Sequence, residues 1–369
     1  MISKVVFIAP KYCVDLKELC KYRGYDEGKL KGLGVKQMAV LYDQNLLDLA
    51  YEALSKIDLS DISLLIVSTE SSKDLSKPLS AKIVDQFDLN RCFTFETKFA
   101  CRAGLDAVLM AESFTRTTGK DSVVVCIDEA IYDIGPAEIT GGCGCAVIKI
   151  EQEGFLDIDL RRSTSYVEDI DDFYKPIDKA TPVVDGRLSI VSYLYCCKNA
   201  ISYWKKLSRH NVTDYFDKLV FHIPFPKIVK WMSAVLYGHE RLKEKRMIHI
   251  ENVLKNPALF NSWREERKEI ESKDDFKEWF KDKVEPSLQL HPFVGNSYTA
   301  SIWLALISTI KNSKINIDDR IGLCGYGSGA GSLCVETLVK DMPRVEYKLP
   351  RERLEVEEYI RWRRKRGID

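Results

Sequence analysis

Two side chains in this 369-residue sequence, Cys101 and Glu70, have the types and surroundings that nucleophilic and acid–base chemistry require. Cys101 lies in FETKFACRAGLDAVLMA, where an extended stretch gives way to a predicted helix. The positive end of a helix dipole lowers the pKa of a thiol, and backbone N–H groups at that turn could hold an oxyanion. Cys101 is therefore a candidate nucleophile, against the more common alternative of a buried, inert cysteine.

Glu70 follows a strongly apolar predicted strand in LLIVSTESSKDLSKP. Sites in open α/β sheets assemble at the carboxyl ends of strands, and partial burial there raises the pKa of a carboxyl group. Glu70 is therefore a candidate proton shuttle, unless it only satisfies the N-terminus of a helix.

His222 comes at the end of another apolar run, in LVFHIPFPK. Its place at a strand end makes it a further candidate, with a structural histidine bonded to a nearby carbonyl as the alternative. Lys227 and Lys230 follow on a predicted helix, where they could meet phosphate groups or only face solvent.

Two loops in the second half of the chain add polar groups. VGNSYTAS places Asn296 and Tyr298 before an apolar helix, and GYGSGAGS places Ser328 in a tight glycine turn. Glycine permits positive φ and close backbone approach, so Ser328 could offer a backbone or hydroxyl donor; a turn that merely packs is the alternative. The lysine and Ser/Thr of a phosphate-binding P-loop are missing from this turn.

Short apolar runs predict the buried strands that must position these groups. They are Val5–Ile8, Leu64–Val67, Val123–Ile127, Ala146–Ile150, Leu219–His222 and Ile321–Cys324. Helical patterns lie between them, for example Asp43–Lys56, Ser80–Phe87 and Gly104–Phe114. The alternation predicts an α/β fold with buried sheets. The pattern runs twice, and TGGCGCAVIKI and GYGSGAGSLCV close the two runs, which indicates an internal duplication.

The composition narrows the function class. Lysine plus arginine is 55 and aspartate plus glutamate is 55, so the zero net charge argues against a general nucleic-acid binder. The first residues lack the long apolar run and cleavage site typical of a secretory signal, and no stretch approaches the apolar length expected of a membrane helix. We expect a soluble cytoplasmic protein whose 11 cysteines are mostly free thiols. Cys143 with Cys145, and Cys196 with Cys197, lack a second ligand pair at zinc spacing, so no metal is expected.

Two charge-rich stretches stand outside this pattern. Residues 237–290 are rich in Lys, Arg, Glu and Trp and read as an insertion of exposed helices with solvated faces; a cofactor or partner surface is the minority interpretation. Residues 346–369 read as a solvated C-terminal helix, with a membrane or nucleic-acid role as the minority interpretation. We divide the rest into residues 1–152 and 153–345.

Six blocks, taken in order, resemble the 3-hydroxy-3-methylglutaryl-CoA (HMG-CoA) synthase family. They are STESSKDLSKP, KFACRAG, DFYKPIDKATPVVDGRLSIVSYL, VFHIPFPK, VGNSYTASIWLALIS and YGSGAG. The resemblance implies a thiolase-like fold, with two similar βαβαβαββ halves in a five-layer α-β-α-β-α arrangement. It also implies a homodimer and a site where the halves join.

The same resemblance implies the reaction. Acetyl-CoA would acylate Cys101 and condense with acetoacetyl-CoA and water to give HMG-CoA, a step of the mevalonate pathway, with Glu70 as acid/base. No metal or redox cofactor is implied, and an acetoacetyl-CoA thiolase is a possible partner. By resemblance, His222 orients the acetoacetyl group, and the remaining substrate-site residues are Asp128, Tyr132, Thr140, Phe173, Lys227, Lys230, Asn296, Tyr298, Gly327 and Ser328.

Some positions depart from the family pattern. Arg102 stands where tyrosine is common, and we expect it to make either an ion pair or a contact with a CoA phosphate. Three alternatives stay open. They are an enzyme that uses acyl-carrier-protein thioesters in polyketide β-branching, another condensing enzyme such as a ketoacyl synthase, and a catalytically silent subunit.

Overall fold

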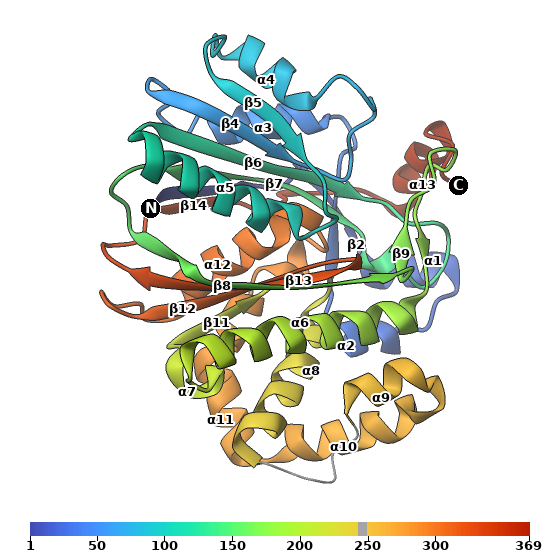
Figure 1. Cartoon of the computed structure of the whole chain (residues 1–369). Helices are drawn as coiled ribbons and strands as arrows, with labels where there is room; N and C mark the ends of the chain where they lie inside the picture. Colours follow the sequence, from blue (N-terminus) through green and yellow to red (C-terminus); the bar gives the residue numbers. More distant parts are fainter. Residues whose placement is uncertain (243–248) are drawn as a thin grey trace.

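The computed structural model describes residues 1–242 and 249–369. Its centre is a ten-stranded sheet in the order β11-β12-β13-β8-β1-β7-β6-β4-β5, with β14 paired to β1 (Figure 1). The strands are β1 (Ile2–Ile8), β4 (Ile62–Ser68), β5 (Phe93–Thr97), β6 (Asp121–Ala130), β7 (Gly142–Ile150), β8 (Leu156–Ile170), β11 (Lys218–Phe221), β12 (Arg320–Gly327), β13 (Gly329–Val339) and β14 (Val345–Lys348). All six predicted strands are present.

The sheet contains the same pattern twice. In the first half, β4 and β6 pair in parallel and β6 and β7 pair antiparallel. In the second half, β11 and β12 pair in parallel and β12 and β13 pair antiparallel. The two halves meet where β1 pairs with β8. The repeated order of pairings confirms the duplication that the sequence indicates.

Alternate residues of β6 explain why the sheet is covered on both faces. Val123 and Val125 pack into one apolar cluster with α3 (Leu46–Leu54), whereas Val124 and Cys126 pack into another with α5 (Ala103–Thr118). Successive side chains of a strand point to opposite faces, so a strand that is apolar throughout needs a helix on each side.

The helices therefore form layers around the two halves. α5 contacts β4 and β6 of the first half and β8 of the second, and α12 (Ser301–Asn312) contacts β11, β1 and β7. Figure 1 shows both helices between the halves. α3 covers the outer face of the first half, and α6 (Gly186–Ser208) covers that of the second. This arrangement confirms the α/β thiolase-like fold. Three shorter helices complete it: α2 (Gly28–Leu33), α4 (Leu79–Gln86) and α7 (Val212–Tyr215).

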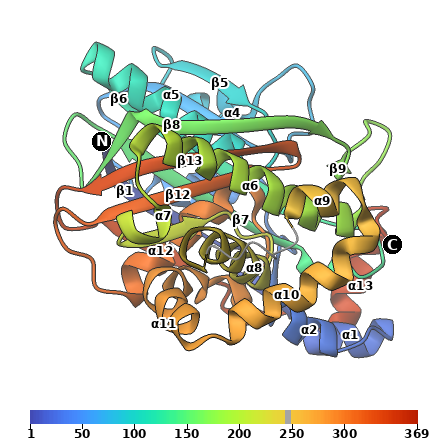
Figure 2. The same ribbon diagram turned by 60° about the horizontal axis from the view of Figure 1, so that its bottom comes forward.

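The predicted insertion packs beneath α6, as Figure 2 shows with this side brought forward. After α8 (Pro226–Tyr237) it contains a π-helix (Gly238–Leu242), α9 (Ile250–Lys255), α10 (Phe260–Ser272) and α11 (Asp274–Lys283). Residues 243–248 lie outside the described residues. Trp263 and Phe276 are buried, so the helices expose only their charged faces and bury an aromatic one.

The expectation of a solvated C-terminal helix is wrong. α13 (Val356–Lys365) packs on α1 (Leu16–Arg23) and on β2 (Tyr12–Asp15), which lies between β3 (Gln37–Val40) and β15 (Glu352–Arg353). Val356, Tyr359 and Ile360 are buried, and Arg363 is only 1% exposed. Their spacing places all four on one face of the helix. The three apolar residues form a stripe that is hard to recognise in the sequence because charged residues surround it. No helix among the described residues has the length and hydrophobicity that a membrane span requires.

Candidate active site

Two carboxylates meet at one edge of the first half. Glu70 follows β4 and Asp128 lies near the end of β6, and these strands are parallel neighbours. Asp128 is fully buried and accepts hydrogen bonds from the Glu70 N–H at 2.6 Å and the Ser71 hydroxyl at 2.8 Å. Its other oxygen accepts from the N–H and hydroxyl of Thr299 at 3.1 and 2.5 Å. Asp128 therefore joins the Glu70 loop to the loop before α12.

Cys101 faces these carboxylates from the turn that precedes α5. Ala100 has a φ of 45°, a left-handed conformation that non-glycine residues rarely adopt, and its carbonyl accepts from the Ala103 N–H at 3.2 Å. Strained residues of this kind are typical of functional sites. Cys101 is half-buried and packs against Tyr132 and Tyr298.

The electrostatics of this pair differ from the sequence expectation in one respect. Burial raises the pKa of the Cys101 thiol well above its usual value, and the neighbouring charge of Glu70 raises it further. The helix terminus therefore does not lower the pKa of Cys101 as predicted, because desolvation and two nearby carboxylates outweigh it. The thiol needs a proton acceptor before it can attack.

Glu70 can supply that acceptor. Burial, followed by repulsion from Asp128, raises the pKa of Glu70 to about 8, the predicted direction. Burial also raises the pKa of Asp128, but its hydrogen bonds hold it lower, at about 6. One Glu70 oxygen, Oε1, is buried and has no hydrogen-bond partner among the described residues. The group can therefore exchange a proton near neutral pH.

His222 directly follows β11 and is 1% exposed. Its backbone is fixed: its N–H donates to the Cys324 carbonyl at 2.8 Å, and its carbonyl accepts from the Tyr193 hydroxyl at 2.7 Å. Both ring nitrogens are buried and lack a hydrogen-bond partner in the described part of the chain. Burial lowers the pKa of His222 to about 3, so the ring is neutral and keeps one free donor. A carbonyl-bonded structural histidine does not describe this side chain.

The glycine turn between β12 and β13 lies against the nucleophile segment. A Cβ atom on Gly327 would stand 2.5 Å from the Phe99 carbonyl oxygen and 3.0 Å from the Arg102 nitrogen. Only glycine permits this approach. Asp172 fixes the far side of the turn, because it accepts from the Gly329 N–H at 2.9 Å. The half-buried Ser328 is thereby held next to the Cys101 turn.

Three aromatic rings wall the pocket. The ring centroids of Tyr132, Phe173 and Tyr298 lie 6.0–6.4 Å apart in edge-to-face pairs. Asn296 is 3% exposed, and its side-chain oxygen accepts from the Tyr298 N–H at 2.9 Å. Burial raises the pKa of the Tyr132 hydroxyl, and the neighbouring side chains of Tyr298 and Asn296 oppose that rise. Phe173 comes from β9 (Phe173–Tyr174), a short strand paired with β10 (Val183–Val184). Tyr132 and Tyr298 cover one side of the half-buried Cys101.

The remaining residues implied by the resemblance are Thr140, Lys227 and Lys230. The Thr140 carbonyl accepts from the Asn296 N–H at 3.3 Å, but its hydroxyl donates to Ala137. Lys227 lies in the first turn of α8. The Lys230 ammonium lies 5.8 Å from the centre of the Phe280 ring, so in this structure Lys230 packs on the helical insertion.

Arg102 makes an ion pair, the first of the two expected roles. Its Nε and Nη2 donate to the two carboxylate oxygens of Asp106 at 2.9 and 3.1 Å, and the guanidinium lies 4.4 Å from the Phe99 ring centre. At 9% exposure, Arg102 is enclosed between the nucleophile turn and β13.

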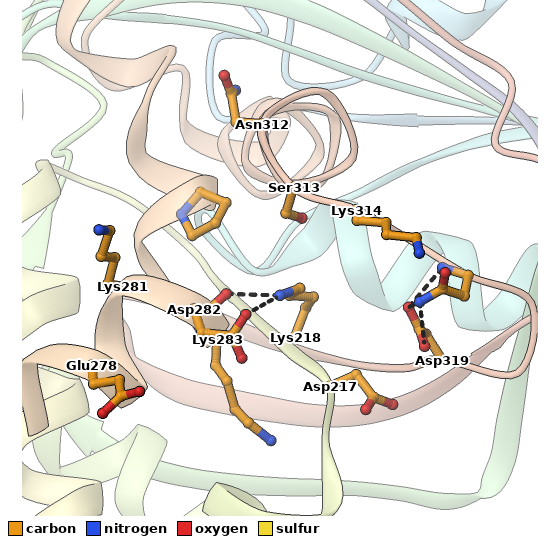
Figure 3. A pocket seen from close by; sticks show the side chains of 12 residues that line it. Asp217, Lys218, Glu278, Lys281, Asp282, Lys283, Asn312, Ser313, Lys314 and Asp319 are labelled. Atoms are coloured by element: carbon orange, nitrogen blue, oxygen red, sulfur yellow. Dashed lines mark hydrogen bonds and ion pairs between the residues drawn. The ribbon is translucent and has the colours of Figure 1, made fainter. Parts of the chain in front are cut away.

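A charged cavity of about 650 Å³ lies in the second half, at the strand ends opposite to those that carry His222 and Ser328 (Figure 3). Lys218, at the start of β11, donates there to Asp282 at 2.7 Å, and Asp319 precedes β12. His222 and Ser328 follow the opposite ends of these strands, roughly 13 Å away for a four-residue strand. The cavity is therefore separate from the site around Cys101.

Sequence reasoning missed several residues that hold the site. Thr299 and Ser71 bind the Asp128 carboxylate, and Asp172 orients the glycine turn. Asp172 immediately precedes Phe173 inside the DFYKP block, which was the available signal. The sequence around Thr299 gave no such signal, because a threonine before a helix ordinarily acts as a helix cap.

Comparison with known families gives one consistent result. The family model described as "Hydroxymethylglutaryl-coenzyme A synthase N terminal" matches residues 2–154, and that described as "Hydroxymethylglutaryl-coenzyme A synthase C terminal" matches residues 156–360.

Individual proteins agree with the family match. The hydroxymethylglutaryl-CoA synthase of Saccharomyces cerevisiae is 31% identical over 93% of this chain and 76% of its own. A polyketide biosynthesis 3-hydroxy-3-methylglutaryl-ACP synthase of Bacillus subtilis is 29% identical over 86% of this chain and 75% of its own. A crystal structure of an HMG-CoA synthase complexed with CoA superposes with a TM-score of 0.76 at 28% identity, covering 92% of this chain and 82% of that one.

Proposed function

Because this chain belongs to the hydroxymethylglutaryl-CoA synthase family, we propose that it condenses acetyl-CoA with acetoacetyl-CoA through an acetylated Cys101. One observation supports this most directly: the Cys101 thiol and the Glu70 carboxyl lie close enough that each shifts the pKa of the other, and the pKa of Glu70 is raised to about 8. A nucleophile and a proton acceptor therefore lie next to each other in the folded protein.

The first half-reaction acetylates the enzyme. The Cys101 sulfur attacks the carbonyl carbon of acetyl-CoA while its proton passes to the Glu70 carboxylate. A new thioester bond forms on Cys101, the bond between the acetyl carbon and the CoA sulfur breaks, and Glu70 returns the proton to the CoA thiolate. One thioester replaces another, so the covalent intermediate is reached at little net cost.

The second half-reaction forms the carbon–carbon bond. Glu70 removes a proton from the methyl group of acetyl-Cys101, and the backbone N–H groups of Cys101 and Ser328 stabilise the enolate oxygen. The enolate carbon attacks the ketone carbon of acetoacetyl-CoA, and protonated Glu70 gives its proton to the new alkoxide. The neutral His222 ring and Asn296 hold the acetoacetyl oxygens in line.

Hydrolysis ends the cycle. Water adds to the thioester carbonyl, the bond to the Cys101 sulfur breaks, and HMG-CoA leaves with the thiol restored. The proposed chemistry needs no metal or redox cofactor, because no step requires an oxidant or reductant and hydrogen-bond donors can stabilise the charge that develops on oxygen. The product would enter the mevalonate route.

We extend the proposal to assembly and compartment. β5 is an edge strand of the large sheet, and Phe93 on it is 66% exposed beside Phe114, which favours a homodimer formed along this edge. Light scattering of the purified protein tests this: a monomer at micromolar concentration would contradict it. All 11 cysteines are free thiols, as in a reducing compartment such as the cytoplasm. Association with an acetoacetyl-CoA thiolase stays part of the proposal.

A turnover assay separates the proposed donor from its main rival. The purified protein is given acetoacetyl-CoA with either acetyl-CoA or an acetylated acyl-carrier protein, and product is identified by mass. We expect HMG-CoA from acetyl-CoA. Product from the carrier-protein donor alone would assign the chain to polyketide β-branching, and no product from either would favour the silent subunit.

A further inference from the structure

We propose that Arg363, in the C-terminal helix α13, is a positioning residue that holds Tyr132 and thereby sets the size of the acyl pocket. The inference rests on the proposed function, since it concerns the pocket around acetyl-Cys101. It assigns an active-site role to a helix that the sequence suggests is only a solvated tail.

The segment in question is the loop of residues 131–141, which joins β6 to β7. Its inner side carries Tyr132, whose ring packs with Cys101 and Tyr298. The loop contains no long helix or strand of its own, only the single 3₁₀ turn Glu138–Thr140. The place of the Tyr132 ring therefore depends on what holds the loop from outside.

Arg363 provides that hold. Its Nη2 donates to the Tyr132 carbonyl oxygen at 2.9 Å, and its Nη1 donates to the Tyr359 hydroxyl at 3.1 Å and lies 3.5 Å from a carboxylate oxygen of Glu138. Arginine is almost never fully buried unless its donors are paired, and here the planar group spans two points of one loop.

Glu138 anchors the loop a second time. It is 1% exposed and accepts from Nη2 of Arg23 at 3.0 Å and from the Tyr25 hydroxyl at 2.8 Å. The same Tyr25 oxygen accepts from the Gly135 N–H at 2.7 Å. The loop is thus fixed near its middle to the region around α1. At its Tyr132 end, the Thr181 hydroxyl donates to Asp133, and Arg363 bonds the Tyr132 carbonyl itself.

A second arginine, Arg366, is linked to Asp128 through Glu129 and Ser71. Arg366 donates to both oxygens of Glu129 at 2.6 Å, and the Glu129 N–H donates at 3.0 Å to the Ser71 hydroxyl that binds Asp128. α13 therefore contacts the site behind Tyr132 and behind Asp128. Of the two, Arg363 carries the proposal because it bonds Tyr132, which belongs to the apolar cluster against which Cys101 packs.

The consequence is a change in acyl selectivity. If the carbonyl of Tyr132 is released, its ring can withdraw from Cys101, and the pocket widens by about the volume of a methylene. A wider pocket discriminates less between acetyl-CoA and propionyl-CoA. A pocket discriminates one methylene group by about tenfold or more, so we expect the selectivity to fall about tenfold.

The test compares Arg363→Lys and Arg363→Met with Arg364→Gln, a control on the same helix whose side chain is 65% exposed. The readout is the ratio of kcat/KM for acetyl-CoA to that for propionyl-CoA, with thermal unfolding measured in parallel. Arg363→Lys keeps the buried charge beside Glu138 and is expected to fold, but lysine lacks the planar fork that reaches the Tyr132 carbonyl.

We expect the ratio to fall about tenfold in both Arg363 variants and to stay at the wild-type value in Arg364→Gln. If Arg363→Met fails to fold, Arg363→Lys decides alone. A folded Arg363→Lys variant with wild-type selectivity would overturn the proposal and leave α13 a purely stabilising element. Failure of the proposed function is seen separately, because the wild-type protein would then process neither acyl-CoA.

Discussion

At the scale of single residues, the site depends on two carboxylates whose environments separate their roles. Glu70 has a pKa of about 8 and one unpartnered oxygen, whereas Asp128 is lower, at about 6, because hydrogen bonds stabilise its charged form. Two titratable groups separated in this way divide proton transfer from structural anchoring. Glu70 moves protons and Asp128 holds the loops.

Glu70→Gln should make the protein more stable above neutral pH. The folded pKa of Glu70 lies above the ordinary value of 4.5, so its contribution favours folding below pH 4.5 and is lost as the pH rises through about 8. Glutamine does not ionise, so the variant does not lose this stability as the pH rises. We expect the variant to unfold several degrees above the wild type at pH 8 and at nearly the same temperature at pH 5.

The matched control for this measurement is Glu278→Gln, an exposed glutamate on α11. It should leave the unfolding temperature unchanged at both pH values. A Glu70→Gln variant that is less stable than the wild type at pH 8 would mean that Glu70 is ionised and well paired in the folded protein.

His222→Ala should separate the two half-reactions. The neutral, unpartnered ring lies at the strand end of the second half and is assigned to acetoacetyl-CoA, so acetylation of Cys101 should survive its removal. We expect kcat/KM for acetoacetyl-CoA to fall about a hundredfold or more, the effect of removing one donor to a developing oxyanion. Exposed His210→Ala serves as the control. Loss of acetylation in His222→Ala would place His222 in the first step instead.

At the scale of elements, close contact between the glycine turn and the Cys101 turn is the feature that assembles the donors. Gly327→Ala would bring a methyl group to 2.5 Å from the Phe99 carbonyl oxygen and 2.9 Å from the Arg102 Cβ. The two turns must then separate, and we expect the rate of Cys101 acetylation to fall at least tenfold.

Gly32→Ala, in the exposed helix α2, is the control because its new methyl group meets nothing within 4 Å. It should leave the acetylation rate unchanged and add up to ~1 kcal/mol of helix stability. An acetylation rate in Gly327→Ala equal to that of the wild type would show that the two turns need not touch.

The elements also show what the sequence could and could not predict. Six of the ten strands of the large sheet are predictable, because runs such as Val123–Ile127 are apolar on both faces. The packing of α13 is not, because Val356, Tyr359 and Ile360 are scattered among charged residues and only their helical spacing reveals a stripe. The raised pKa of Cys101 also escapes the sequence, because it arises from burial and from carboxylates distant in the chain.

At the scale of the whole molecule, the site is divided between the duplicated halves. Cys101 and Glu70 come from the first half, and His222 and Asn296 come from the second. The bonds from Thr299 to Asp128 fix the halves to each other at the reacting groups. The order of the motifs along the chain predicts this division. The hydrogen bonds that join the halves link residues far apart in the sequence, so a single sequence does not reveal them.

The most direct test of the account is the intact mass of the protein after incubation with acetyl-CoA alone. We predict one added acetyl group per chain, absent in Cys101→Ala and discharged as HMG-CoA when acetoacetyl-CoA is added. In Glu70→Ala, that discharge should collapse. An acetyl group that persists in Cys101→Ala, or a wild-type protein that acquires none, would contradict the assignment of Cys101 as the nucleophile that accepts acetyl from CoA.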